Sequence, residues 1–493
     1  MFMDLISPSF QMLAAAKLTL TQLVTAGVLG GSVAMLWSYA NWRAAVKVAF
    51  VIALLEGAIR KWLLPGGQEM VYFLKDVFLL GAYLKFFLAP DAELRAYRLK
   101  LPTTLICVLA ATLLPAVLND NIGSMVLALY GLKIYLFYIP LLFMMPYLFR
   151  TEQEMNRQMT WYALIAIPIC LLGAAQFAAG ASSPLNVYAQ NTGDAVSGFG
   201  FGEKVRITGT FSYITGHLTF IIFFTALSLA LLAQGQTRWK WLLMGGVLPL
   251  LAGNAMMNGS RTSIYVVGLV LIGFTLASVS GKLGSNKSFT AMLLTGVAIC
   301  AVAGSYFFYE AFQNIATRAK TSDDSVYSRA VTHPIHAIEQ ALSEAGLGGY
   351  GIGMSHPATE GMRKALKIPA PKRKSPVYDM EVGQVMVEVG PLIAIGWYIL
   401  RLVCVFTVWN AYFACQNFFQ KPILLMAGLL NLPYLGMGVV YNHTANMLLF
   451  GITGLAFVSL LEPTVKRRFP QGSRQFAAPG PSKAPLLKGA PAK

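Results

Sequence analysis

The sequence predicts an all-α polytopic membrane protein, and three observations carry this prediction. Of the 493 residues, 56% are hydrophobic and only 12% are charged, whereas a soluble domain is about half apolar and a quarter charged. The mean hydropathy is +0.59. Apolar runs of about 20 residues, the length that crosses a bilayer as a helix, recur along the chain. We therefore expect about 12–13 transmembrane helices.

Thirteen apolar runs define the expected spans. The final two form one long apolar stretch that YNHT at 441–444 interrupts, and we interpret YNHT as a tight turn. The runs cover residues 19–39, 45–64, 71–88, 103–118, 125–148, 159–180, 217–234, 241–257, 262–280, 289–311, 385–410, 422–440 and 445–461.

The distribution of basic residues predicts the orientation, because short cytoplasmic loops are enriched in Lys and Arg. One set of connections is basic, and the tail that begins with VKRRF falls on the same side. The opposite short connections hold little beyond Lys204, Arg206 and Arg261. We therefore predict that the basic set is cytoplasmic. It comprises Arg43, Lys47, Arg95, Arg98, Lys100, Arg150, Arg157, Arg238, Lys240, Lys282, Lys287 and Lys421.

Two long segments, 181–216 and 313–384, are then expected to face outward, and the second is long enough to fold as a small cap. Residues 323–346 of this cap predict an amphipathic helix that ends at Gly346. Its N-cap is expected at Asp324 or Ser325, and its apolar stripe at Val326, Ala330, Ile335, Ile338 and Leu342. Residues 1–461 thus form one transmembrane domain, and 462–493 form a basic tail predicted to be disordered.

Several classes of function lack the sequence features they require. The net charge of +17 sits largely in loops and in the tail, without a basic stripe interleaved with aromatics, so we expect no nucleic-acid partner. No cysteine spacing or carboxylate–histidine pattern indicates a metal, and the pair His333 and His336 is a weak candidate. GLGGYG at 346–351 follows no strand and is predicted to form a turn rather than a nucleotide site. We expect no cofactor.

The stretch LLEGAIRKWLLPGG at 54–67 places Glu56, Arg60 and Lys61 in a predicted span. A charge at membrane depth costs a few kcal/mol or more, so such residues usually serve a function. Under the predicted orientation these residues and Lys75 lie toward the outer side, as do all five histidines. Two structural alternatives stay open, a Glu56–Arg60 salt bridge and an Arg60–Asp76 pair.

Two arginines on the less basic face have small neighbours. Arg206 precedes ITGTF, and Arg261 lies within NGSRTS. A guanidinium binds phosphate through two parallel hydrogen bonds, and Gly and Ser leave room for a ligand. Anchoring to lipid headgroups is the alternative interpretation.

The segment VYDMEVGQVMVEVGPLIAIG contributes three acids near the outer side. Asp379 and Glu381 are expected just before the bilayer, where they are either site residues or the polar collar of a helix N-terminus. Glu388 lies deeper, at the start of the apolar run, where a carboxylate is costly.

RITGTF, GSRTS, GLGGYGIG and DMEVGQVMVEVGPLIAIG occur in this order across about 200–460. This arrangement resembles the O-antigen ligase and O-antigen (Wzy-type) polymerase superfamily of bacterial membrane glycosyltransferases. The resemblance implies a GT-C-like enzyme in the bacterial cytoplasmic membrane, with its active site facing the periplasm. Such enzymes move a glycan from a polyprenyl-diphosphate carrier onto a sugar hydroxyl without a metal.

The resemblance also implies roles for individual residues. Arg206 and Arg261 match the arginines thought to hold the donor diphosphate. Family ligases carry a His where this chain has Asp379, and this departure favours a polymerase or a divergent transferase over a ligase.

The acceptor hydroxyl needs a base within hydrogen-bond reach. Asp379 is the first candidate, followed by Glu381 and His356. We expect Arg60, Lys61, Lys75 and Arg329 to form an accessory cationic surface near the diphosphate.

Two other classes of protein remain open. A flippase or secondary carrier has a comparable number of spans, but carriers usually place their charges at the membrane midplane and show repeat symmetry. A non-catalytic scaffold is a third possibility. The partners expected for a transferase are a polyprenyl-diphosphate-linked glycan, a glycan or lipid acceptor, membrane lipids and proteins of envelope polysaccharide assembly.

Overall fold

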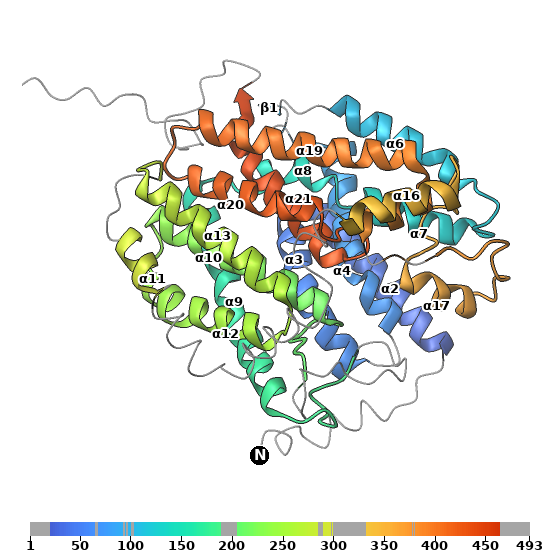
Figure 1. Ribbon diagram of the computed structural model, residues 1–493, viewed down its shortest axis with the longest axis horizontal. Coiled ribbons are helices and arrows are strands. Elements are labelled where there is room, and N and C mark those ends of the chain that lie inside the picture. Colours follow the sequence, from blue (N-terminus) through green and yellow to red (C-terminus); the bar gives the residue numbers. More distant parts are fainter. Residues whose placement is uncertain are drawn as a thin grey trace, which may run out of the picture.

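The computed structural model shows helices packed side by side, with small helices at one edge (Figure 1). Apart from two short strands, the regular elements of the described chain are helical. The structure describes residues 20–64, 68–91, 94, 97–99, 103–188, 205–283, 289–296, 298, 332–376, 378 and 380–463.

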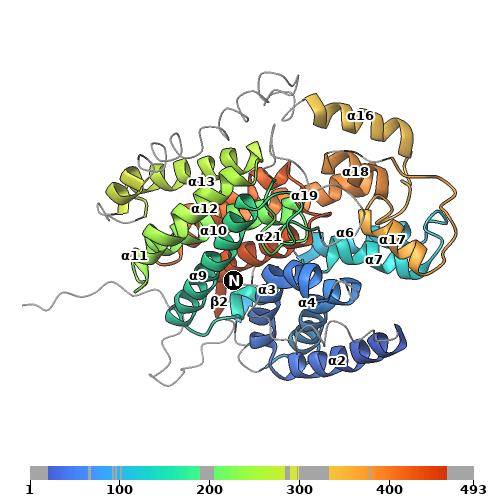
Figure 2. The ribbon, with the colours of Figure 1, turned by 90° about the horizontal axis from the view of Figure 1, so that it is seen from below.

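The N-terminal helices form one group, which lies together in the view from below (Figure 2). Strand β1 follows this group and pairs antiparallel with β2 near the end of the described chain. The elements are α2 (Leu20–Ala40), α3 (Trp42–Ala58), the π-helical η1 (Ile59–Leu63), α4 (Gln68–Tyr83), the π-helical η3 (Leu84–Leu88), β1 (Tyr97–Leu99) and β2 (Leu461–Pro463).

The predicted span 125–148 is not one straight helix. It forms α7 (Met125–Leu136), α8 (Leu141–Met144) and η4 (Met145–Tyr147), bent by 41°. Pro140 lies at the break, since proline has no N–H to donate and its ring disrupts a continuing helix. Asn446 Nδ2 donates to the Ile134 carbonyl over 2.8 Å, which satisfies a carbonyl of the last turn. Helix α6 (Thr103–Val117) precedes this unit.

A second group of helices surrounds α10, which is almost entirely buried. Its green colours mark it in Figure 1. The predicted spans of this region each form helix, although 241–257 is divided by a π-helical turn. The elements are α9 (Glu152–Ala178), α10 (Ile214–Gln234), α11 (Lys240–Leu242), η5 (Leu243–Val247), α12 (Leu248–Met257) and α13 (Arg261–Val279).

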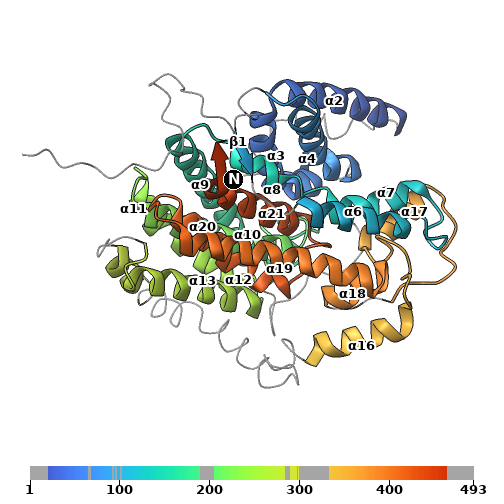
Figure 3. The same ribbon diagram turned by 90° about the horizontal axis from the view of Figure 1, so that it is seen from above.

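The described part of the predicted cap contains α16 (His333–Ala345), α17 (Pro357–Ala365) and α18 (Glu381–Val389). Figure 3 shows α16 beside α18, at the edge of the molecule.

Helix α16 ends at Gly346 as predicted, with a φ of +61°. Of the predicted apolar stripe, Ile338 packs against the core, but two other residues do not. Ile335 and Leu342 are exposed, whereas Ala337 and Ala341 are buried. The reason is the close approach of α18, where a Cβ on Gly383 would lie 2.9 Å from that of Ala337. The predicted N-cap and the first part of the stripe lie outside the described residues.

The C-terminal helices, in orange and red, run along the upper side of Figure 1 and reach its centre. Helix α19 (Pro391–Ala414) follows α18 across Gly390, whose φ is +82°. The break before the last helix is longer than the predicted turn at 441–444. Helix α20 (Lys421–Asn431) and η7 (Pro433–Leu435) end well before α21 (His443–Ala456) and η8 (Phe457–Leu460) begin.

Five of the described helices are long and apolar enough to cross a membrane, and the bent pair at Met125–Tyr147 makes a sixth if it counts as one span. This supports a multi-pass all-α membrane protein. The predicted number of 12–13 spans stays a prediction. The five helices are Glu152–Ala178, Ile214–Gln234, Arg261–Val279, Pro391–Ala414 and His443–Leu460.

The described helix ends fall into two groups, and hydrogen bonds join several ends of one of them. On the side predicted to be cytoplasmic, Lys47 pairs with Glu154 over 2.6 Å, and Asn417 donates to Glu152 over 3.0 Å. The β1–β2 pairing lies at this end as well. The charged residues near Arg60 lie about 25 Å further along the α3–η1 helix than Arg43. They therefore belong to the opposite group of helix ends.

Candidate functional site

A buried polar cluster lies among helices α3, η1, α4 and α7, and we call it the Tyr72 cluster. Three cations face the ring of Tyr72: the Arg60 guanidinium carbon and the ammonium nitrogens of Lys75 and Lys133 lie 5.2, 4.9 and 4.5 Å from its centroid. The cluster comprises Glu56, Arg60, Tyr72, Lys75, Asp76, Tyr130, Lys133, Tyr138, His356 and His443.

Two of the cations form short ion pairs across helices. Lys75 Nζ lies 2.5 Å from Glu56 Oε2, and Lys133 Nζ lies 2.7 Å from Asp76 Oδ2. Tyr138 donates a further hydrogen bond to Asp76 over 2.7 Å. These pairs join α4 to α3 and to α7. Each pair also supplies a counter-charge to a buried ammonium group, which lowers the cost of burying that group.

The Glu56–Arg60 ion pair that the sequence left open does form, but Arg60 shares this carboxylate with Lys75. Arg60 Nη1 donates to Ser212 Oγ over 2.9 Å and lies 3.8 Å from Glu56 Oε1, beyond hydrogen-bond distance. Its Nε has no hydrogen-bond partner among the described residues, although the side chain is buried. The predicted Arg60–Asp76 pair does not form, because Asp76 pairs with Lys133. Arg60 thus sits where the cluster meets the loop that contains Ser212.

Two histidines present unpartnered ring nitrogens to the cluster. Within the described chain, His356 Nε2 and both nitrogens of His443 are buried without a hydrogen-bond partner. The two ring centroids are 5.4 Å apart, and the His443 ring packs edge-on against Tyr72 at 5.1 Å. Buried polar atoms normally have partners, so three orphaned nitrogens in one place indicate a site for a ligand or for water.

A chain of hydroxyl groups leads to His356. Tyr72 and Tyr130 share a hydrogen bond of 3.1 Å, and the Tyr130 hydroxyl lies 3.2 Å from His356 Nδ1. That nitrogen also accepts from the Ala358 N–H over 3.1 Å and so caps α17. Because Nδ1 accepts, we assign the proton of the neutral ring to Nε2, which then faces the cluster as a donor. Burial, followed by the charge of Lys133, lowers the pKa of His356.

Glu388 explains how a glycine-rich turn holds His356 in place. Its carboxylate accepts from the Ser355 N–H and hydroxyl, both over 2.7 Å, from the Gly353 N–H over 3.1 Å and from Tyr135 over 2.9 Å. A Cβ on Gly131 of α7 would lie 2.5 Å from the Ile352 carbonyl oxygen. The predicted turn therefore forms, wedged between α7 and α18.

Glu381, a predicted catalytic candidate, is fully engaged by other groups of the protein. It pairs with Arg401 over 2.6 Å and accepts from the backbone N–H groups of Val439 and Val440. Its side chain is only 2% exposed. This geometry holds the segment before His443 in position and leaves little capacity to accept a proton from a substrate.

The loop 205–212 connects the Tyr72 cluster to the two predicted diphosphate-binding arginines. Arg206 Nε donates to the Asn258 carbonyl over 2.9 Å, three residues before Arg261, which opens α13. Further along the loop, Ser212 accepts from Arg60. Gly57 permits this contact, because a Cβ there would lie 2.4 Å from the Ser212 nitrogen.

Lys61 secures the same loop. Its ammonium donates to Thr208 Oγ1 over 3.0 Å and to the Gly209 carbonyl over 2.7 Å. The residue is buried. It therefore holds the loop in place through these hydrogen bonds and does not form an open cationic surface. Lys75 is likewise 1% exposed.

The structure thus brings together most of the predicted site residues, with Arg60, Lys75 and His356 in the cluster and Lys61 and Arg206 on the loop beside it. Arg261 follows the Asn258 turn, and Glu381 lies behind the segment that leads to His443. The candidate base Asp379 and the accessory Arg329 lie outside the described residues. No group of three or more His, Cys, Asp or Glu side chains in the described chain is arranged to hold a metal.

Three central residues were not among the predicted site residues, although the sequence contains a signal for two of them. Lys133 is a lone cation inside the apolar run 125–148, and such residues are usually functional. His443 lies in the interruption between the last two spans. Tyr72 gave no signal, because an aromatic residue near a span end is an ordinary interfacial residue.

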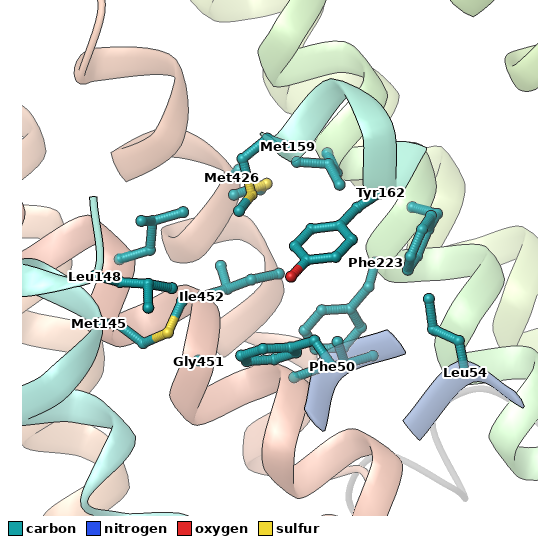
Figure 4. Close-up of a pocket in the computed structure, with 14 residues that line it drawn as sticks. Phe50, Leu54, Met145, Leu148, Met159, Tyr162, Phe223, Met426, Gly451 and Ile452 are labelled. Atoms are coloured by element: carbon teal, nitrogen blue, oxygen red, sulfur yellow. The ribbon is translucent and has the colours of Figure 1, made fainter. Parts of the chain in front are cut away.

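Two apolar cavities among the described residues lie apart from the cluster. One, of about 50 Å³, is lined by apolar side chains such as Phe50, Met159 and Phe223 (Figure 4). The Tyr162 side chain borders it, and its hydroxyl donates to the Lys47 carbonyl over 2.9 Å. A second is an apolar groove of about 340 Å³ between η3, α6 and α7–α8. Neither has the polar lining that transfer chemistry requires.

Comparisons of the chain with protein-family models, with curated proteins and with solved structures found no match.

Proposed function

We propose that the protein is a metal-independent glycosyltransferase that moves a glycan from a polyprenyl-diphosphate carrier onto a sugar hydroxyl, as a polymerase or ligase. One observation supports this best: a single loop, 205–212, carries Arg206 next to the Asn258–Arg261 turn and also contacts Arg60 of the Tyr72 cluster, whose two histidines have unpartnered ring nitrogens among the described residues. This loop therefore joins the proposed diphosphate-binding pair to the histidines that we propose handle the proton. The sequence resemblance to O-antigen ligases and polymerases supports the same chemistry.

In this mechanism the acceptor oxygen bonds to the anomeric carbon of the donor while the bond from that carbon to the diphosphate oxygen breaks. The electron pair leaves with the polyprenyl diphosphate, whose developing charge Arg206 and Arg261 stabilise by fixed hydrogen bonds. The proton of the acceptor hydroxyl passes to a base. His443 fits this role best among the described residues, because both of its ring nitrogens are unpartnered.

The other candidates receive different roles. His356, which in its assigned tautomer donates through Nε2, orients the acceptor oxygen. Glu381 positions the segment before His443. Asp379 remains an alternative base, two residues before Glu381. The proposed setting is the bacterial cytoplasmic membrane with this site at the periplasmic face, where lipid-linked donor, acceptor and envelope polysaccharide assembly proteins meet.

The test is transfer by purified protein in nanodiscs, with a polyprenyl-diphosphate oligosaccharide as donor and EDTA present. Wild type is compared with Arg206→Ala and Arg261→Ala, and with the control Arg238→Ala, an exposed arginine at the other group of helix ends. Release of polyprenyl diphosphate with a longer glycan, lost in both site variants and kept in the control, would establish a polymerase. Transfer to a different acceptor would establish a ligase. No release by folded protein from any host-derived donor would refute the proposal.

A carrier is the second candidate, and two features favour it. The buried pairs Glu56–Lys75 and Asp76–Lys133 join three helices, and the interruption before α21 resembles the broken helices of carriers. Movement of a labelled lipid-linked glycan across proteoliposomes, without cleavage of its diphosphate bond, would identify this function. Cleavage without such movement would exclude it.

A further inference from the structure

The Tyr72 cluster contains more positive than negative charge. Among the described residues, Arg60, Lys75 and Lys133 face two carboxylates, Glu56 and Asp76, which pair with the two lysines at 2.5 and 2.7 Å. The excess of one positive charge stays the same when the neighbouring charged residues are counted, because Lys61 adds one positive charge and Glu388 adds one negative charge. All three cations are largely buried: Arg60 is 8% exposed, Lys75 is 1% exposed, and the Lys133 side chain is 11% exposed. A buried charge without a counter-charge is strongly destabilising.

The uncompensated charge can be assigned to Arg60. Its nearest carboxylate oxygen is 3.8 Å away and belongs to Glu56, whose other oxygen holds Lys75. Its Nε is buried without a partner among the described residues. Nearby, His356 Nε2 and both His443 nitrogens are also unpartnered. Arg60 and His443 both contact the Tyr72 ring, at 5.2 and 5.1 Å from its centroid.

We propose that the Tyr72 cluster is an anion-binding site for an acidic group on the glycan itself, either a sugar carboxylate or a sugar phosphate. Arg60 supplies the charge, and the ring N–H of His443 donates a hydrogen bond, while the other His443 nitrogen and His356 Nε2 serve the acceptor hydroxyl. Loop 205–212 places Arg206 at Asn258 and Ser212 at Arg60, so this site and the diphosphate-binding pair use different arginines. The inference rests on the proposed function, and it adds that the enzyme selects acidic glycans.

The test measures thermal stabilisation of purified protein in detergent by three sugars on one scaffold: glucose, glucuronate and glucose 6-phosphate. Inorganic pyrophosphate serves as the probe of the diphosphate pair. The variants are Arg60→Gln, Arg60→Lys and the control Lys47→Gln, which removes a cation from α3 about 20 Å away. Arg206→Gln and Arg261→Gln are tested with pyrophosphate.

Stabilisation by an acidic sugar but not by glucose, weakened roughly tenfold in apparent affinity in Arg60→Gln and retained in Lys47→Gln, would support the site. The stronger of the two acidic sugars identifies the group as carboxylate or phosphate. If Arg60→Gln does not fold, retained binding in Arg60→Lys and the comparison among sugars on wild type decide. Equal stabilisation by glucose, none by either acidic sugar, or full binding by folded Arg60→Gln would overturn the inference.

The pyrophosphate measurements distinguish a failure of this inference from a failure of the proposed function. If pyrophosphate stabilises wild type and Arg60→Gln but not the Arg206 and Arg261 variants, the result supports diphosphate binding by Arg206 and Arg261. This conclusion does not depend on the sugar measurements. If acidic sugars bind but pyrophosphate does not, the result would support the anion-binding site and refute the proposed donor site.

Discussion

His443 is surrounded by aromatic rings and has no hydrogen-bond partner in the described chain. Tyr72, Tyr130, Tyr138 and His356 all lie within 6.4 Å of it, measured between ring centroids. These contacts fix the plane of the imidazole while leaving its nitrogens available. A histidine that served only to stabilise the fold would gain from a hydrogen bond at this depth. Its lack of one favours a role in chemistry.

Replacing His443 with Gln is expected to lower kcat at least about 100-fold, because general-base catalysis typically contributes that much. Binding of the donor diphosphate should change little, since Arg206 and Arg261 remain. Single-turnover transfer and donor binding on the same preparations measure both quantities. His336→Gln, an exposed histidine with its side chain 71% accessible, is the matched control. A rise in KM with unchanged kcat would assign His443 to binding alone.

His356 should make the protein less stable in acid. Its pKa is lowered in the folded state, whereas in the unfolded chain it titrates near its ordinary value of about 6.5. Above that pH both states are neutral and the residue adds no pH dependence. As the pH falls below about 6.5, only the unfolded state gains the proton, so stability is lost.

We therefore expect His356→Gln to flatten the pH dependence of Tm between pH 7 and 5, where the wild type should lose about 2 kcal/mol through this residue. Thermal unfolding in detergent at several pH values provides the measurement, and His336→Gln again serves as control. Parallel curves for wild type and His356→Gln would contradict the expectation.

At the scale of elements, the glycine turn and α18 act as one unit. The turn contributes backbone N–H groups, α18 contributes the Glu388 carboxylate that accepts them, and α7 packs against the other side. The Tyr350 and Gly351 N–H groups also donate to carbonyls at the end of α18, over 2.8 and 2.9 Å. Glu388 is thus a positioning residue for His356, and its cost at this depth is offset by four hydrogen bonds.

Substitution of Glu388 should destabilise this unit in a graded way. Glu388→Gln loses an acceptor and leaves part of the donor set unsatisfied, and Glu388→Ala leaves all four donors without this partner. Each buried donor left unpaired costs about 1–3 kcal/mol, so Tm should fall for Gln and further for Ala. Glu339→Gln, with its side chain 67% accessible, controls for loss of a carboxylate. Wild-type Tm in Glu388→Gln would show that the carboxylate is not the organising group.

The elements could be predicted because length and hydropathy determine where apolar helices form, and the described part of each predicted span is largely helical. The breaks between and within helices were harder to predict from the sequence. Pro140 bends a run that hydropathy treats as continuous, and the long interruption before α21 depends on Glu381 accepting from Val439 and Val440. The site was predicted in part, because lone charges in apolar runs are visible in a sequence. Ion pairs such as Asp76–Lys133 depend on helix packing, which periodicity does not reveal.

For the whole molecule, the described helix ends fall into two groups, and the charge distribution gives each group a predicted side. The basic group includes the Lys47–Glu154 pair and the strands β1 and β2. The other group carries the Tyr72 cluster and the described part of the cap. Because the proposed donor is used at the periplasmic face, the function requires the second group to lie outside the cytoplasm.

Cysteine labelling in intact cells tests that arrangement. Lys372→Cys in the cap replaces a side chain that is 75% accessible and should react with a membrane-impermeant maleimide. Arg238→Cys, in an exposed position on the basic side, should react only after the cells are permeabilised, because the positive-inside rule places it in the cytoplasm. The parent protein, which retains the exposed Cys107, measures the background. The opposite pattern would put the Tyr72 cluster on the cytoplasmic side, where it could not use a donor presented at the periplasmic face.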